Sequence, residues 1–257
     1  AGLASRIQVM LRRHGYTLVA ADCGHNILSQ AEAVEFLLSA NVDGLIVLHL
    51  ETDIRQLDGY QKHAVPVLAM LSKPEELEYD CVLLDNYTVS YSAMRYIISH
   101  HHQRIGILGG AENDRVARER LQGYMAAMRN ARLPVDSTYI SYGEFSAQSG
   151  YERMLMMMGG SNPPDAVFIT DFRTTFGALI AVKEMKLKIP DQLGLVGFGN
   201  ADLVRSMCPR ISVMVNPLDK LASTAVSVMM ERLAEEKPEP IRHIYKIPAE
   251  FYIGESV

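Results

Sequence analysis

The chain has 257 residues, of which 48% are hydrophobic and 21% charged, so it is long and apolar enough to fold around a core of its own. Its formal net charge of −5 argues against a duplex-binding surface within these residues. No apolar run reaches the ~18 residues needed to cross a bilayer, and the chain does not open on a signal-peptide profile, so we expect no contact with a membrane.

The cysteines bear on the cellular compartment. Cys23, Cys81 and Cys208 are odd in number, far apart and without Cys-x-x-Cys spacing. This usage fits buried thiols better than a disulfide or zinc framework. We therefore expect a protein of the reducing cytoplasm.

Short apolar runs alternate with amphipathic stretches along most of the chain. The apolar runs, which predict strands, are 16–21, 44–50, 65–71, 82–84, 105–108, 166–170, 193–198 and 211–215. The amphipathic stretches, which predict helices, are 30–40, 90–99, 118–131, 150–158, 174–185 and 218–236. Strands that are apolar on both faces belong to parallel sheets covered by helices on both sides. The pattern therefore predicts an α/β protein.

A helical pattern precedes the predicted strand 16–21. A doubly wound unit normally begins with a strand whose carboxyl end faces the ligand crevice. We therefore expect that a preceding strand and its loop belong to this fold but lie outside the sequence.

Thr170 and Asp171 stand between a predicted strand and a predicted helix. Open α/β sheets bind ligands outside the carboxyl ends of their strands, so both residues are candidates for ligand contact. Asp171 also has the position and chemistry of a helix N-cap. The sequence leaves open whether Asp171 only caps the helix or caps it beside a ligand contact made by Thr170.

Arginines follow the predicted strand 105–108 at positions 115, 118 and 120. A planar guanidinium at a crevice can hold two adjacent hydroxyls or a carboxylate through paired hydrogen bonds. Arg120 lies beside the helix start, next to a face that Leu121 and Tyr124 bury, so we assign it to the ligand. Arg115 and Arg118 are interpreted as solvent-facing.

The other motifs indicate no metal, cofactor or catalytic site. The run His100-His101-His102 lacks Cys or Glu partners at metal-ligand spacing, so we expect no metal. Gly197-Phe198-Gly199 lacks the third glycine of a dinucleotide fingerprint, so we expect no cofactor. No Gly-x-Ser-x-Gly elbow or nucleophile beside a base is evident, and no catalytic residue is assigned.

Stretches spread over nearly the whole chain resemble, in order and spacing, the effector-binding region of LacI/GalR-type transcription regulators, which is related to periplasmic sugar-binding proteins. They include Gly15-Tyr16-Thr17-Leu18, Val42-Asp43-Gly44-Leu45-Ile46-Val47, Val65-Pro66-Val67, Leu84-Asp85-Asn86, His102-Gln103-Arg104-Ile105-Gly106, Arg120-Leu121-Gln122-Gly123-Tyr124, Ser149-Gly150-Tyr151, Pro164-Asp165-Ala166-Val167-Phe168, Pro209-Arg210-Ile211-Ser212 and Asn216-Pro217.

This resemblance implies two doubly wound parallel-sheet lobes joined by three crossovers, with a small effector between them. The expected N-terminal lobe comprises 1–101 and 216–240, and the expected C-terminal lobe comprises 102–215 and 241–257. Regulators of this kind act as homodimers on operator DNA through a helix-turn-helix headpiece, which is absent from this sequence.

The resemblance also implies site residues. Arg120 takes the position of the arginine that grips ligand hydroxyls or a carboxylate, and Thr170 that of a polar contact residue. Phe145 matches an aromatic residue that lies against a sugar or base face, and Thr88 lies in a loop that lines the cleft. Asn200 stands where the family usually has an acidic residue, which puts a standard monosaccharide ligand in doubt.

The sequence therefore predicts the ligand-sensing domain of a LacI/GalR-type regulator and not an enzyme. Two alternatives stay open, an exported solute-binding receptor with the same fold and an enzyme on a doubly wound scaffold. A signal peptide encoded upstream of Ala1 would favour the receptor, and a helix-turn-helix the regulator.

Overall fold

The computed structural model describes residues 2–22, 27–48, 65–71, 79–200, 208–235 and 242–257. It divides into two compact units. Unit 1 comprises Ala1–Leu84 and Pro217–Ile247, and unit 2 comprises Asp85–Asn216 and Pro248–Val257. The chain therefore passes between the units three times, as expected.

Two of these passages lie away from the predicted boundaries. Helix α4 (Asn86–Ser99) packs on α5 (Arg115–Asn130), so it belongs to unit 2 and the first boundary follows Leu84 rather than residue 101. Strand β9 (Ile244–Ile247) pairs with β3 (Asp80–Leu84), which keeps the chain in unit 1 beyond residue 240. The remaining boundary, at Pro217, lies one residue from its predicted place.

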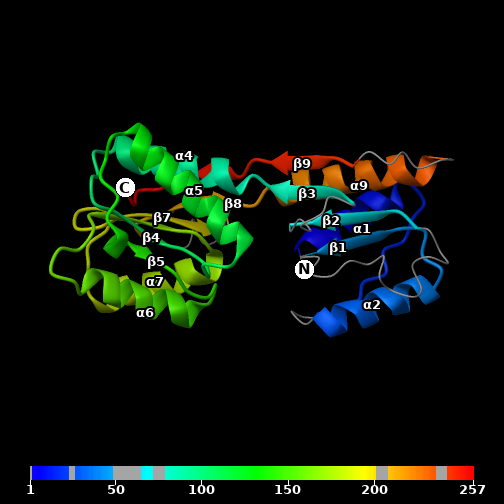
Figure 1. Cartoon of the computed structure of the whole chain (residues 1–257), viewed down its shortest axis with the longest axis horizontal. Helices are drawn as coiled ribbons and strands as arrows, with labels where there is room; N and C mark the ends of the chain where they lie inside the picture. Colours follow the sequence, from blue (N-terminus) through cyan, green and yellow to red (C-terminus); the bar gives the residue numbers. More distant parts are fainter. Residues whose placement is uncertain (1, 23–26, 49–64, 72–78, 201–207, 236–241) are drawn as a thin grey trace. The chain divides into compact units, whose positions relative to one another are not determined.

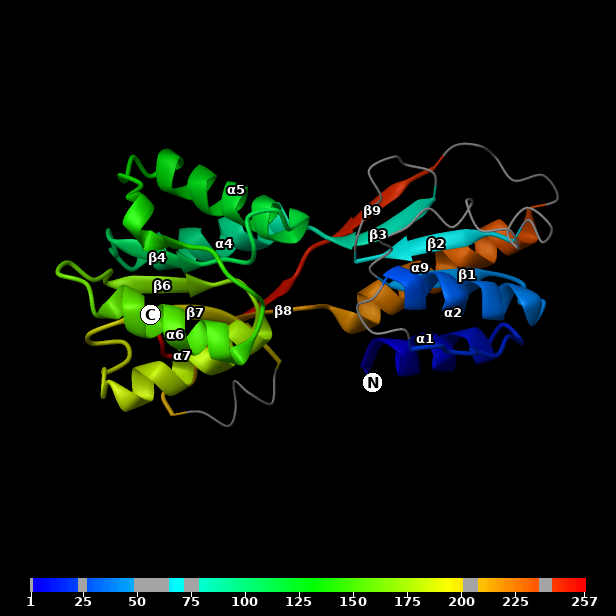
Figure 2. The same ribbon diagram turned by 60° about the horizontal axis from the view of Figure 1, so that its bottom comes forward.

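Unit 1 is built on a parallel sheet in the order β1 (Leu45–Leu48), β2 (Val67–Met70), β3, β9 (Figure 2). Its strand residues alternate between two apolar clusters because successive side chains point to opposite faces. Leu68, Met70 and Val82 pack with α1 (Gly2–Arg12) and α9 (Leu218–Ala234). Ala69, Cys81 and Leu83 pack with α2 (Ile27–Ser39). Helices therefore cover both faces of the sheet.

The strand predicted over 16–21 is wrong. This segment follows α1 without forming a strand, and Val19 is 57% exposed. Tyr16 and Leu18 still pack against the core of unit 1. A strand requires a hydrogen-bonded neighbour, and none of the described strands pairs with this segment. Packing of Tyr16 and Leu18, rather than sheet pairing, therefore accounts for part of the apolar pattern that suggested a strand.

The cysteine prediction is partly right. Cys81 is buried in β3, whereas Cys208 is exposed just ahead of Pro209 and β8 (Ser212–Val215). Cys23 lies outside the described residues.

Unit 2 holds a sheet in the order β10 (Glu250–Tyr252), β8, β7 (Gly194–Gly199), β6 (Ala166–Ile169), β4 (Ile105–Leu108), β5 (Ile140–Ser141). All neighbours are parallel except β10, which is antiparallel to β8. Helices α4 and α5 lie on one face, and α6 (Ala147–Met158) and α7 (Phe172–Glu184) lie on the other (Figure 1).

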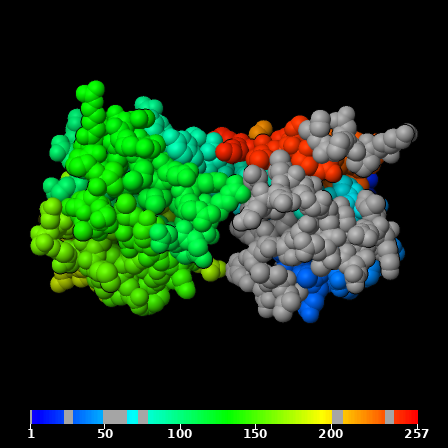
Figure 3. All heavy atoms as spheres, in the orientation of Figure 1, coloured from blue at the N-terminus to red at the C-terminus, as the bar shows by residue number. Residues whose placement is uncertain are grey.

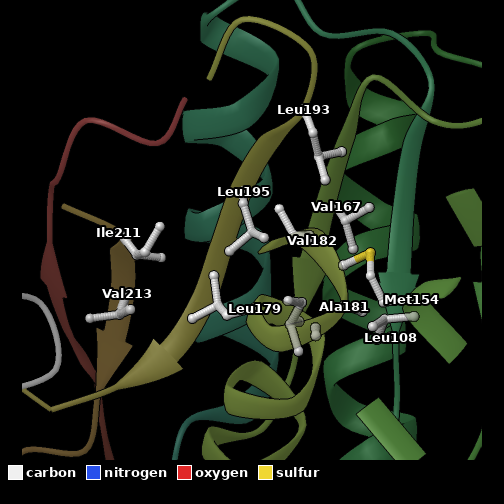
Figure 4. Close-up of a cluster of buried hydrophobic side chains, with 12 residues drawn as sticks. Leu108, Met154, Val167, Leu179, Ala181, Val182, Leu193, Leu195, Ile211 and Val213 are labelled. Carbon is white, nitrogen blue, oxygen red and sulfur yellow. The ribbon is translucent and has the colours of Figure 1, made fainter. Parts of the chain in front are cut away.

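One apolar layer of unit 2 lies between this sheet and the α6–α7 pair. Val167, Leu195 and Val213 from three neighbouring strands meet Met154 of α6 and Val182 of α7 (Figure 4). In the space-filling view, the face of this unit turned to the viewer is formed mainly by the segments coloured green, from the middle of the chain (Figure 3). None of the helices in the described ranges is long and apolar enough to span a membrane.

Four helices of unit 2 begin earlier than predicted because capping side chains precede them. Asp85 accepts a hydrogen bond from the Thr88 amide, and Asp114 and Ser146 cap α5 and α6 in the same way. Asp171 caps α7, as both of its predicted readings required. Each cap satisfies a backbone N–H of the first turn, which lets the helix start at the next residue.

Candidate functional site

The carboxyl ends of β4 and β6 form the topological switch point of unit 2. After β4 the chain adds β5 on one side, and then returns to add β6 on the other side. The segments that follow these strands therefore lead away from the sheet in opposite directions, and doubly wound proteins bind ligands at such a point. Residues that follow these strands are the natural place to look for a site.

Arg120 and Thr170 meet at this switch point. Arg120 lies on α5, its side chain is buried, and its Nη1 donates a hydrogen bond to the Thr170 carbonyl. Thr170 follows β6 and is fully buried, and its hydroxyl donates to the Leu108 carbonyl at 2.9 Å. Thr170 therefore ties the ends of β4 and β6 together and holds Arg120 through its backbone rather than through its hydroxyl.

Two residues that the sequence analysis missed complete the setting of Arg120. Its Nε donates to Asn86 Oδ1 at 2.9 Å, and its Cζ lies 4.2 Å from the centroid of the Phe198 ring. Asn86 is the first residue of α4 and Phe198 the penultimate residue of β7. The sequence signals were present, because Asn86 follows a strand end and Phe198 approaches one.

One nitrogen of the Arg120 guanidinium, Nη2, is available to a ligand. Within the described part of the chain, Nη2 donates no hydrogen bond. Burial lowers the pKa of Arg120 to about 10, an effect that nearby Asp171, Asp114 and Glu119 partly oppose. The group thus stays charged at neutral pH in a desolvated position, where a hydrogen bond to a charged donor is strong.

Asp171 supplies an acceptor at the same place. Its Oδ1 accepts hydrogen bonds from the amide and hydroxyl of Thr174, at 3.0 and 3.3 Å. Oδ2 accepts none from the residues that the structure describes. The cluster of Asn86, Arg120, Thr170, Asp171 and Phe198, called the Arg120 cluster below, therefore offers a buried donor beside a free carboxylate oxygen.

Phe145 lies in the loop ahead of α6 and is half-buried. A methyl group built on Gly110 would lie 2.8 Å from two carbons of the Phe145 ring, so the ring rests directly on the backbone that follows β4. Only a residue without a side chain allows this approach. Phe145 is thus positioned beside the loop that leads from β4 to Arg120.

Thr88 and Asn200 are less tightly defined. Thr88 is exposed in the first turn of α4 and its backbone N–H donates to Asp85 at 3.1 Å. Asn200 is exposed directly after β7. Both stay predicted ligand contacts.

The remaining charged and metal-binding candidates have structural partners. Arg115 pairs with Glu119 at 3.0 Å, and Arg118 donates to the Asn113 carbonyl from an exposed position. His102 contacts Asp165 at 3.3 Å. In the described ranges, no group of His, Cys, Asp or Glu is arranged to hold a metal ion.

The chain forms two units, each built on an open, largely parallel sheet, and passes between them three times. These features, with a polar cluster at a switch point, define the two-unit class of periplasmic-binding-protein type. Residues 94–257 match the family of periplasmic binding protein-like domains. The chain is 28% identical over 227 residues to the HTH-type transcriptional repressor CytR of Escherichia coli K12, covering 88% of this chain and 67% of that protein.

It is also 30% identical over 230 residues to the HTH-type transcriptional repressor PurR of Escherichia coli O1:K1, again covering 88% of this chain and 67% of the relative. Two solved structures share the fold. One is the complex of the regulator CelR with cellobiose, with a TM-score of 0.86 and 24% identity, which covers 100% of this chain and 78% of that one. The other is a LacI-family regulatory protein from Chloroflexus aggregans, with a TM-score of 0.87 and 23% identity, which covers 99% of this chain and 91% of that one. The chain belongs to the LacI/GalR family of transcription regulators and forms its periplasmic binding protein-like domain.

Proposed function

We propose that this domain senses a small metabolite that binds at the Arg120 cluster, and that binding is read out as a change in operator affinity without any bond being made or broken. The observation that carries the proposal is Arg120 itself. A buried, charged guanidinium is held on two sides by Asn86 and Thr170 and keeps Nη2 available. Such a pre-oriented donor is built to receive an acceptor.

The chemistry of the cluster defines the ligand in outline. Arg120 Nη2 would donate to a ligand hydroxyl, carbonyl or carboxylate, and Asp171 Oδ2 would accept from a ligand hydroxyl or amine. Thr88, Asn200 and the Phe145 ring would complete the contacts, with Phe145 against a flat face of the ligand. We assign no cofactor and no catalytic residue, because none of these groups forms a nucleophile–base pair.

The ligand acts by differential affinity. It shifts a conformational equilibrium only as far as it binds one state more tightly than the other, and a coupling of ~1–3 kcal/mol changes operator affinity about 5- to 150-fold. DNA contact is assigned to a helix-turn-helix segment outside these residues. The net charge of −5 supports this division, and so does the description of CytR and PurR as HTH-type repressors. We further propose a cytoplasmic homodimer.

Thermal unfolding with a ligand panel tests the proposal. The panel comprises free sugars, including cellobiose, together with sugar phosphates and nucleobases. A ligand that binds only the folded state stabilises it by about 2.7 kcal/mol at a hundred times its Kd, which raises the melting temperature in proportion to the logarithm of concentration. At least one class should produce such a shift while remaining chemically unchanged.

Two outcomes would contradict the proposal. One is a flat response to every class at millimolar concentration. The other is conversion of the stabilising compound into a product, which would indicate an enzyme. Sequencing the gene upstream of Ala1 provides an independent check, because an encoded export signal in place of a helix-turn-helix would favour a solute receptor.

A further inference from the structure

A second buried arginine lies near the Arg120 cluster but is not part of it. Arg153 projects from α6, is only 8% exposed, and directs its donors at four backbone carbonyls. Nη1 reaches the Gly109 carbonyl at 2.6 Å and the Ser141 carbonyl at 3.1 Å. Nη2 reaches the Glu144 carbonyl at 3.3 Å, and Nε the Ser149 carbonyl at 3.2 Å.

These carbonyls belong to the segments that shape the site. Gly109 follows β4, Ser141 ends β5, and Glu144 directly precedes Phe145. The same segments are joined by two backbone hydrogen bonds, from the Gly109 amide to the Ser141 carbonyl at 2.8 Å and from the Gly143 amide to the Gly110 carbonyl at 3.3 Å. Arg153 therefore connects the loop that carries Phe145 to the backbone on which the Phe145 ring rests.

The arrangement requires arginine. A planar fork of five N–H donors can serve four carbonyls in fixed directions, whereas a lysine ammonium offers only three donors from one point. The fit is also tight, because a methyl group at Gly143 would lie 2.8 Å from Arg153 Nε. Burial lowers the pKa of the Arg153 guanidinium, and the charge of Asp171 opposes this shift.

We propose that Arg153 is a positioning residue, which holds Phe145 against Gly110 and thereby sets how tightly the site binds its ligand. The statement about affinity rests on the proposed function. The statement about the loop does not, so the two are tested separately.

Amide hydrogen exchange on the unliganded chain tests the loop. In Arg153→Lys, amides of residues 109–111 and 142–146 should exchange about tenfold faster or more, while β6 and β7 keep wild-type protection. Arg129→Lys, at an exposed position late in α5, is the matched control and should change neither region. Wild-type exchange in both loop segments of Arg153→Lys would overturn the proposal. If the variant fails to fold, Gly143→Ala, which crowds the same guanidinium, replaces it.

A double-mutant cycle tests the effect on binding. The probe is the compound of the sugar, sugar phosphate and nucleobase panel that most stabilises the wild type. Arg153→Lys and Phe145→Leu should each weaken its binding about tenfold, and combining them should weaken it little further, because both remove the same contact. Fully additive losses would show that Arg153 acts elsewhere and would overturn the proposal.

The two failures can be told apart. If no compound of the panel binds the wild type, the proposed function fails, and the exchange measurement still decides whether Arg153 positions the loop. If a compound binds and Arg153→Lys binds it with wild-type affinity, the inference about Arg153 fails while the proposed function stands.

Discussion

The guanidinium carbon of Arg120 lies 4.2 Å from the centroid of the Phe198 ring. Phe198 comes from β7, whereas the hydrogen-bond partners of Arg120 come from α4 and from the end of β6. A cation over an aromatic face is worth about 0.5–2 kcal/mol, more when desolvated. The two hydrogen bonds hold Nε and Nη1 of the guanidinium, and the ring restrains the group on the side of β7.

Replacing Phe198 should weaken ligand binding more than folding. In Phe198→Leu the ring is lost but apolar volume is largely kept, so we expect affinity to fall about tenfold, equivalent to ~1.4 kcal/mol, and stability to fall by about 1 kcal/mol. Phe168→Leu is the matched control, since Phe168 is fully buried with its ring centroid 6.4 Å from that of Phe198. Calorimetric titration of both variants measures ligand affinity, and urea unfolding measures stability. Equal losses of affinity in Phe198→Leu and Phe168→Leu would refute a specific role for Phe198.

The buried hydroxyl of Ser90 leads us to predict a stabilising substitution. Its side chain is fully buried in α4, and Oγ finds no hydrogen-bond partner among the described residues. Removing an unsatisfied buried hydroxyl should relieve a desolvation cost, so Ser90→Ala should raise the free energy of unfolding by about 1 kcal/mol.

The contrasting variant is Ser212→Ala. Ser212 is equally buried, but its Oγ accepts a hydrogen bond from the Gly254 amide at 3.0 Å. Leaving that amide unsatisfied should lower the free energy of unfolding by about 1–3 kcal/mol. Denaturant unfolding should therefore give opposite signs for the two serines, and a loss of stability in Ser90→Ala would contradict the interpretation.

An ion pair near the C-terminus predicts a pH dependence. Hydrogen bonds from the Arg210 side chain, and then from its backbone amide, lower the pKa of Glu255 below its ordinary value. A carboxyl group whose pKa is lowered in the folded state stabilises it above the unfolded-state pKa, and this contribution is lost as the pH falls towards the folded-state pKa. The melting temperature should therefore fall between about pH 5 and pH 3 partly because of Glu255.

Glu255→Gln should lower the melting temperature at neutral pH and flatten its decline in acid. Glu112→Gln is the control, because Glu112 is exposed in the β4–α5 loop. Melting temperatures recorded across this pH range test the prediction. If the melting temperature of Glu255→Gln falls with pH as steeply as that of the wild type, Glu255 does not contribute.

The class of the fold could be predicted from the sequence because its strands are buried on both faces. Runs such as 105–108 and 166–170 are almost wholly apolar, which leaves little room for another interpretation. Short edge strands escaped detection. β5 has two residues, and among the described strands β10 pairs only with β8, so neither needs a run of apolar residues. The segment 16–21 shows the opposite error, since Tyr16 and Leu18 pack without strand pairing and Val19 is exposed.

The candidate site was predictable where a residue type and a strand end coincide. Thr170 and Asp171 met both conditions, Arg120 was suggested by its residue type beside a helix start, and the structure brings the three together at one switch point. Arg153 did not stand out, because it lies within a helix and joins that helix to the Gly109 carbonyl, 44 residues away along the chain. Contacts of that range are set by tertiary packing and leave no local pattern.

The central claim, that Arg120 anchors the ligand, is tested most directly by calorimetric titration of the wild type, Arg120→Lys and Arg118→Lys with the panel compound that stabilises the wild type most. Arg118 is exposed on the same helix, so its variant should bind within about twofold of wild type. Arg120→Lys should remain folded but lose about tenfold to a hundredfold in affinity, equivalent to ~1.4–2.8 kcal/mol. Undiminished binding by a folded Arg120→Lys would contradict the account.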